Sequence, residues 1–100
     1  MKIAVDAMGG DYAPMEIIKG SLIAARELDI GIILVGPQEI IRRELSRYDT
    51  SGIDIEIMHT DEYLIEGEAP AYALRNKRNA SIFLTVRQVK EGKAVAAVGM

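Results

Sequence analysis

Apolar residues along this chain switch between continuous runs and helical spacing. The runs at 3–7 and 32–35 are almost entirely apolar, as expected for strands that helices cover on both faces. From Pro14 to Leu28 and from Pro37 to Leu45, apolar residues recur every three or four positions, which predicts two helices that each bury one side. Both prolines suit a helix start, where the missing N–H costs nothing.

The second half of the chain has a more varied pattern. Residues 53–57 alternate between apolar and polar, which is typical of a strand with one wet face near the edge of a sheet. We expect a connecting loop over 59–69, a short helix over 70–77, a longer helix over 79–91 and a last strand over 94–98. The buried stripe of the longer helix is predicted to contain Ile82, Phe83, Val86 and Val89.

This alternation of strands and helices predicts an α/β fold with right-handed crossovers and a mostly parallel sheet. Ligands in such folds bind beyond the carboxyl ends of the strands, so the loops that follow the strands are the places to look for a site. The chain contains no internal repeat, low-complexity segment or linker. We therefore expect residues 1–100 to form one domain or part of one.

The composition narrows the kinds of site that the chain can carry. No cysteine is present, which excludes disulfides, zinc–thiolate centres and thiol catalysis. The net charge is −3 and aromatic residues make up 5% of the chain, so nucleic acid is not expected as a ligand. No apolar run approaches the roughly 20 residues that span a bilayer, and the first residues do not resemble a secretion signal. A cytoplasmic location is therefore expected.

The first candidate site is the loop after the first strand. Gly9 and Gly10 allow positive φ angles and a close approach of the backbone to a ligand, and the following helix would offer unpaired N–H groups to an anion. The loop matches neither of the usual glycine-rich nucleotide motifs. It could bind a ligand or simply form a tight turn. Asp6 and Asp11 could act in acid–base chemistry, bind a metal or cap the loop.

The second candidate site is the basic segment from Arg75 to Ser81, which precedes the longer helix. Arg75, Lys77 and Arg78 would attract phosphate, while Asn79 or Ser81 could cap the helix or leave its amides free for an anion. A solvated basic helix end is the alternative.

One further cluster combines histidine with carboxylates. His59, Asp61 and Glu62 offer only one imidazole, so we interpret His59 as a loop histidine held by hydrogen bonds and expect no metal site. Glu66 and Glu68 are expected to be solvated.

The Asp-Ala-Met-Gly-Gly-Asp loop, followed two residues later by Ala-Pro, resembles the amino terminus of the PlsX family of phosphate acyltransferases. Further matches follow in family order and cover nearly all of the chain. The matching residues are Met1 to Asp11, Ala13-Pro14, Ile17 to Gly20, Leu34 to Gly36, Ile57 to His59, Asp61-Glu62, Pro70, Arg75, Lys77 to Asn79, Ser81 and Val89 to Ala94.

The resemblance implies a Rossmann-like three-layer α/β core, similar to that of phosphotransacetylases. It also implies a reversible transfer of a fatty acyl group from acyl carrier protein to inorganic phosphate, giving acyl phosphate for phospholipid synthesis. Family members need no organic cofactor, form homodimers and associate peripherally with the inner face of the membrane. Phosphate would attack the thioester directly, without a covalent enzyme intermediate.

The resemblance implies that both candidate sites line the acyl-phosphate cleft. It does not identify the catalytic residues. The residues expected to bind phosphate or substrate are Asp6, Gly9, Gly10, Asp11, Arg75, Lys77, Arg78, Asn79 and Ser81.

The chain departs from the family pattern in three places. Family members usually carry two basic residues where this chain has Arg75-Asn76, and two serines where it has Ala80-Ser81. They also continue after the last strand into a Ser-Ala-Gly-Asn-Thr-Gly-like loop and a long second portion, so we expect residues 1–100 to be the N-terminal portion of a longer protein. Two other functions stay open. The chain could be a non-catalytic half-domain that binds an anion or acyl carrier protein, or a relative with a different acyl or phosphate substrate.

Overall fold

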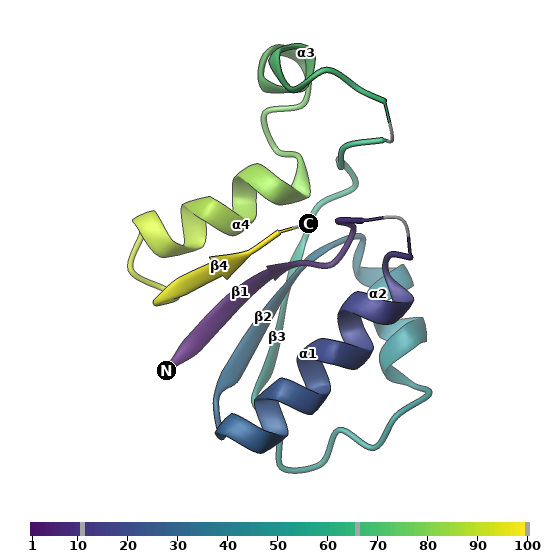
Figure 1. The fold of residues 1–100 in the computed structure, drawn as a ribbon, viewed down its shortest axis with the longest axis vertical. Coiled ribbons are helices and arrows are strands. Elements are labelled where there is room, and N and C mark those ends of the chain that lie inside the picture. The colour runs from purple at the N-terminus through teal and green to yellow at the C-terminus, as the bar shows by residue number, and fades with distance from the viewer. Residues whose placement is uncertain (11, 66, 100) are drawn as a thin grey trace.

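The structure is a computed structural model that describes residues 1–10, 12–65 and 67–99. Strands and helices alternate along the chain as the hydrophobic pattern predicts (Figure 1). In chain order the elements are β1 (Lys2–Asp6), α1 (Met15–Leu28), β2 (Gly31–Gly36), α2 (Gln38–Leu45), β3 (Ile55–His59), α3 (Pro70–Asn76), α4 (Ser81–Lys90) and β4 (Ala96–Val98).

All strand pairs in the sheet are parallel, and the strand order is β3-β2-β1-β4. Ile3 pairs with Ile32 on one side and with Ala96 on the other, which places β1 in the interior of the sheet. The edge position predicted for the alternating segment is confirmed, since β3 lies at the end of the sheet. The predicted α/β fold with a parallel sheet is confirmed as well.

The helices form two layers around the sheet. Figure 1 shows α1 and α2 on one side of the strands and α4 on the other, while α3 lies beyond the end of the sheet. The two faces follow from topology, because right-handed crossovers in opposite directions place their helices on opposite faces. The result is the expected three-layer arrangement.

The face covered by α1 and α2 holds the larger hydrophobic core. Each of the two helices contributes aliphatic side chains that pack on the residues of β1 and β2 that face them. This core consists of Val5, Ala7, Ile18, Leu22, Ala25, Ile32, Leu34 and Ile41.

The face covered by α4 is packed differently. Its core contains Ala4, Ile33, Val35 and Ala94, which is half as many buried residues as the other core has. The most buried residues of α4 are Ser81, Thr85 and Gln88, and Val86 is 56% exposed. The apolar stripe predicted for this helix is therefore wrong at Val86. The buried side is polar because Thr85 and Gln88 satisfy their own side chains by donating to the carbonyls of Ser81 and Leu84.

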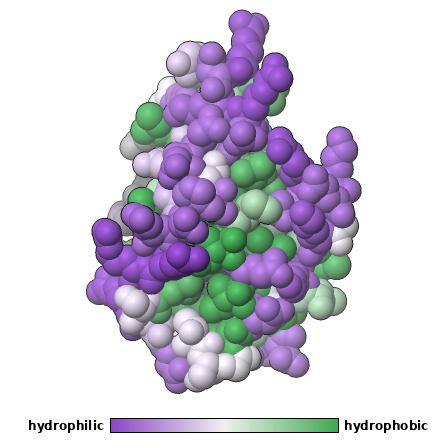
Figure 2. Space-filling view, turned by 180° about the vertical axis from the view of Figure 1, so that it is seen from behind, coloured by the Kyte–Doolittle hydropathy of each residue, from purple (hydrophilic) through white to green (hydrophobic). Residues whose placement is uncertain are grey.

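Large hydrophobic side chains are also exposed outside the two cores. Leu28, Leu74, Val86, Val95 and Val98 are each close to half exposed or more. On the face seen from behind, hydrophobic surface gathers in the middle and hydrophilic residues surround it (Figure 2).

Candidate functional site

The loop after β1 is held by the aspartate that ends the strand. Asp6 is only 5% exposed, and its Oδ1 accepts a hydrogen bond from the N–H of Met8 at 3.0 Å. Its backbone carbonyl accepts from the N–H of Gly9 at 3.3 Å. Of the roles considered for Asp6, the structure therefore displays the loop cap. Asp11 lies outside the described residues.

The two glycines of this loop have different surroundings. Gly9 is buried, and its N–H is used by the Asp6 carbonyl. Gly10 is exposed and has a φ of 89°, a conformation that side chains other than glycine rarely adopt. Within the described residues, the N–H of Gly10 donates to no other backbone group. Among the described residues of this loop, Gly10 therefore combines an exposed position with an N–H that no other backbone group accepts.

The basic segment contains two exposed arginines and one partly buried lysine that is hydrogen-bonded. Arg75 and Arg78 are exposed. Lys77 is partly buried, and its Nζ donates to Glu68 Oε1 at 2.8 Å and to the carbonyl of Tyr63 at 3.2 Å. This hydrogen bond from Lys77 is the main cause that lowers the pKa of Glu68. The expectation that Glu68 is solvated is wrong, because its side chain is largely buried against Lys77.

The start of α4 differs from the prediction. The residue at the N-cap is Ala80, and no side chain caps the helix, so of the two roles left open for Asn79 and Ser81 the structure does not display capping. Ser81 is 1% exposed, its N–H donates to the carbonyl of Glu62 at 2.8 Å, and its Oγ has no hydrogen-bond partner within the described chain. An unpaired hydroxyl is therefore buried at the beginning of this helix.

A buried threonine joins the end of β3 to the start of α4. Thr60 donates its N–H to the carbonyl of Gly36 at 3.0 Å and its Oγ1 hydroxyl to the carbonyl of Asn79 at 2.7 Å. Sequence reasoning missed Thr60, although its position directly after a predicted strand was a usable signal. Through this contact the basic segment is attached to the carboxyl edge of the sheet.

Both candidate segments lie at that edge. The glycine loop follows β1, and α4 runs back toward the sheet from the same end, beside which α3 stands (Figure 1). The fold thus brings Gly10, Arg78, Asn79 and Ser81 to the side of the sheet where ligands bind in such folds.

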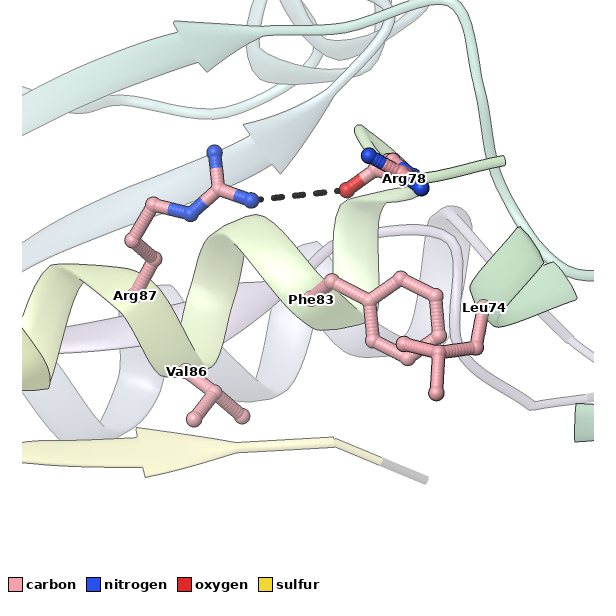
Figure 3. Close-up of a pocket in the computed structure, with 5 residues that line it drawn as sticks. All are labelled: Leu74, Arg78, Phe83, Val86 and Arg87. Carbon is pink, nitrogen blue, oxygen red and sulfur yellow. Dashed lines mark hydrogen bonds between the residues drawn. The ribbon is translucent and has the colours of Figure 1, made fainter. Parts of the chain in front are cut away.

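A groove lies between α3 and α4 and has a volume of about 450 Å³. Figure 3 shows Leu74 close to the ring of Phe83, with Val86 further along α4. Arg78 and Arg87 line the same groove, and an Nη atom of Arg87 lies 3.5 Å from the carbonyl oxygen of Arg78. The groove therefore combines an apolar floor with two cations.

The interpretation of His59 as a hydrogen-bonded histidine is confirmed. Its Nδ1 accepts the N–H of Gln38 at 3.0 Å, and its Nε2 lies 3.4 Å from Asp61 Oδ2. Among the residues that the structure describes, no three histidine or carboxylate side chains form a group that could hold a metal ion. No helix in the described part of the chain is long and apolar enough to cross a membrane.

Known proteins are similar to the chain over nearly all of its length. The chain is 54% identical over 98 residues to the phosphate acyltransferase of Moorella thermoacetica. The aligned residues make up 98% of this chain and 29% of that protein. It is 49% identical to the phosphate acyltransferase of Pelotomaculum thermopropionicum over 98% of this chain and 28% of the relative. The chain thus spans less than a third of the length of these relatives. The family described as "Fatty acid synthesis protein" matches residues 1–100, and the chain belongs to this family.

Proposed function

We propose that this chain supplies the phosphate-binding part of a phosphate acyltransferase. The reaction is the reversible transfer of a fatty acyl group from acyl carrier protein to inorganic phosphate, giving acyl phosphate for phospholipid synthesis. The observation that carries the proposal is that an exposed glycine backbone and a basic segment lie at the same end of the sheet. Identity of 49% and 54% to relatives named phosphate acyltransferase supports it.

The chemistry needs a phosphate held in line with a thioester carbonyl. A phosphate oxygen forms a bond to the carbonyl carbon, the resulting tetrahedral oxyanion collapses, and the C–S bond breaks to release the carrier thiol. Arg75 and Arg78 would draw phosphate to the edge, and the Gly10 N–H would contact its oxygens. Donors fixed at such a site stabilise the oxyanion without reorganising.

The remaining site residues have supporting roles in this proposal. Asp6 shapes the glycine loop, and Lys77 fixes the basic segment through Glu68. Asn79 lies at the same edge, and the unpaired Oγ of Ser81 is a hydrogen-bond donor available beneath it. The proposal includes acyl carrier protein as the acyl donor, a homodimeric assembly and peripheral membrane association.

The test is to incubate the chain with acyl carrier protein thioester and 32P-labelled phosphate and to separate labelled acyl phosphate by chromatography. Labelled acyl phosphate that forms only when the chain is present confirms the proposal. Phosphate binding without product would assign this chain a binding role only. A stable acyl-enzyme would contradict direct attack by phosphate.

Two variants test the site residues in that assay. Arg78→Glu reverses a charge at the proposed entrance and should weaken phosphate binding about tenfold, as loss of a charge-assisted hydrogen bond does. Lys90→Glu is the matched control, because it makes the same charge change at the other end of α4. Equal effects of the two variants would remove the assignment of Arg78.

A further inference from the structure

The groove between α3 and α4 leaves large apolar side chains open to water. Leu74 on α3 is 61% exposed and Val86 on α4 is 56% exposed, although both line the groove. The ring of Phe83, which lies close to Leu74 in Figure 3, is only partly buried. Neighbouring apolar side chains that remain exposed are typical of a surface that binds a partner. The groove is therefore a candidate binding surface.

Two arginines border this apolar surface without an acidic partner. Among the described residues, no Asp or Glu oxygen lies within 4.0 Å of the guanidinium of Arg78 or Arg87. By contrast, Lys2, Lys77 and Lys93 are each paired with a glutamate. Because the chain as a whole has a net charge of −3, the groove is a local excess of positive charge.

The shape and the charge of the groove distinguish between possible occupants. A fatty acyl chain would cover the apolar side chains but would leave both arginines without a partner. A bilayer surface is flat on this scale and does not fill a depression of about 450 Å³. A helix with an apolar face and an acidic face fits both features, since its apolar side chains enter such a groove and its carboxylates pair with arginines at the border.

The position of the groove connects it to the proposed phosphate site. α4 spans ten residues, or about 15 Å, so about three turns of a partner helix could lie along it. Arg78 lines the groove and also belongs to the basic segment that precedes α4. A partner bound along α4 would therefore lie beside the end of the sheet where phosphate is proposed to bind.

We propose that the groove between α3 and α4 docks an acidic, amphipathic helix of a protein partner. Leu74, Phe83 and Val86 contact its apolar side chains, and Arg87 pairs with its carboxylates. In the reaction proposed above this partner is acyl carrier protein, and this part of the inference rests on the proposed function. Docking beside Arg78 would bring the carried thioester to the phosphate site.

The test measures the dissociation constant between the chain and acyl carrier protein by isothermal titration calorimetry. Val86→Glu and Arg87→Glu each add a negative charge or remove a positive one in the groove, and each should weaken binding about tenfold. Ile23→Glu on α1, where the side chain is 51% exposed, is the control for Val86→Glu. Lys90→Glu, at the end of α4, is the control for Arg87→Glu. Both controls should bind as wild type does, and equal losses in groove and control variants would overturn the proposal.

The charge pairing is tested by compensation. Acidic helix residues of the carrier are changed to lysine one at a time, and one such change should restore binding to Arg87→Glu while weakening binding to wild type. If no carrier variant restores binding, the pairing with Arg87 is wrong. Absence of carrier binding by wild type would also overturn the proposal. So would a Val86→Glu variant that binds the carrier normally but no longer binds phosphatidylglycerol vesicles or no longer self-associates, since the groove would then serve a lipid surface or a second copy.

A phosphate titration followed at the Gly10 amide separates this inference from the proposed function. Val86→Glu and Arg87→Glu should leave the phosphate-induced shift unchanged, because neither residue belongs to the proposed phosphate site. If the carrier binds through the groove but no acyl phosphate forms, the proposed function fails and the docking surface stands. If acyl phosphate forms at the wild-type rate in both groove variants at low carrier concentration, the docking surface fails and the proposed function stands.

Discussion

The two faces of the sheet are packed in opposite ways. On one face, α1 and α2 bury branched aliphatic side chains such as Ile18 and Ile41. On the other face, α4 turns Ser81, Thr85 and Gln88 inward and leaves Val86 exposed. The first face gains most from the hydrophobic effect, which grows with the apolar area removed from water. On the second face Thr85 and Gln88 bond to carbonyls of their own helix, and the hydroxyl of Ser81, at the carboxyl edge, has no partner among the described residues. The difference teaches that the larger apolar core lies on the α1 and α2 side, while the side of α4, which begins at the proposed phosphate site, is packed through polar groups.

Truncating adjacent residues of β2 should give the largest change in the free energy of unfolding, and it compares the two faces directly. Ile33 and Leu34 are both almost fully buried, have side chains of equal size and belong to the cores on opposite faces. Truncation to alanine should cost about 2–5 kcal/mol, with Leu34→Ala toward the upper end and Ile33→Ala toward the lower end. Urea unfolding of the two variants measures the free energy of unfolding. A larger loss for Ile33→Ala would reverse the roles given to the two faces.

The buried polar side of α4 gives a second, smaller effect. Thr85→Val removes the hydroxyl that donates to the Ser81 carbonyl at 2.6 Å and should cost about 1 kcal/mol. Ser81→Ala removes a hydroxyl without a partner in the described residues, so the free energy of unfolding should stay the same or rise. Thermal unfolding compares the two variants. If Ser81→Ala destabilised the fold more than Thr85→Val, the hydroxyl of Ser81 would be structural rather than held for a ligand.

Removing the Lys77–Glu68 pair should change how the free energy of unfolding depends on pH, and only in the acid range. The pKa of Glu68 is lowered in the folded state, chiefly by the hydrogen bond from Lys77, so the pair stabilises the fold above the ordinary glutamate pKa. This contribution is lost as the pH falls through the lowered pKa. Glu68→Gln should therefore flatten the decrease in stability on acidification, as followed by urea unfolding across pH 2–7. If the free energy of unfolding fell equally with pH in wild type and in Glu68→Gln, the pair would not contribute to stability.

The outward residue of α4 should give the smallest effect. Val86→Ala removes two methyl groups that are already largely in water, and it replaces a β-branched residue by a better helix former. We expect a change within about 0.5 kcal/mol in the free energy of unfolding. Ile41→Ala on α2, where the side chain is fully buried, is the matched comparison and should cost several times more. A loss of more than 1 kcal/mol for Val86→Ala would mean that this side of α4 is packed.

The hydrophobic pattern predicts the elements well and their packing less well. Periodicity is a property of nearby residues, so it locates α1, β2 and the alternating edge strand β3. It wrongly places Val86 on the buried side of α4, where Thr85 is buried instead with its hydroxyl bonded to a carbonyl of its own helix.

The candidate site is predicted only in part for a related reason. The φ of Gly10 follows from a local turn, and glycine in the sequence indicates it. The pairing of Lys77 with Glu68 and the link from Thr60 to Asn79 depend on how a long loop closes over the sheet edge. No pattern of residue types along the chain specifies those partners.

The most direct test of the central claim is a phosphate titration of the 15N-labelled chain, because it asks where the anion binds without requiring turnover. We expect saturable shifts of the Gly10 amide and of the amides at the start of α4, and we expect Arg78→Glu to weaken them. Gly31, at the opposite edge of the sheet, is the internal reference and should not shift. Shifts confined to that opposite edge, or no saturable shift at Gly10, would contradict a phosphate site at the carboxyl ends of the strands.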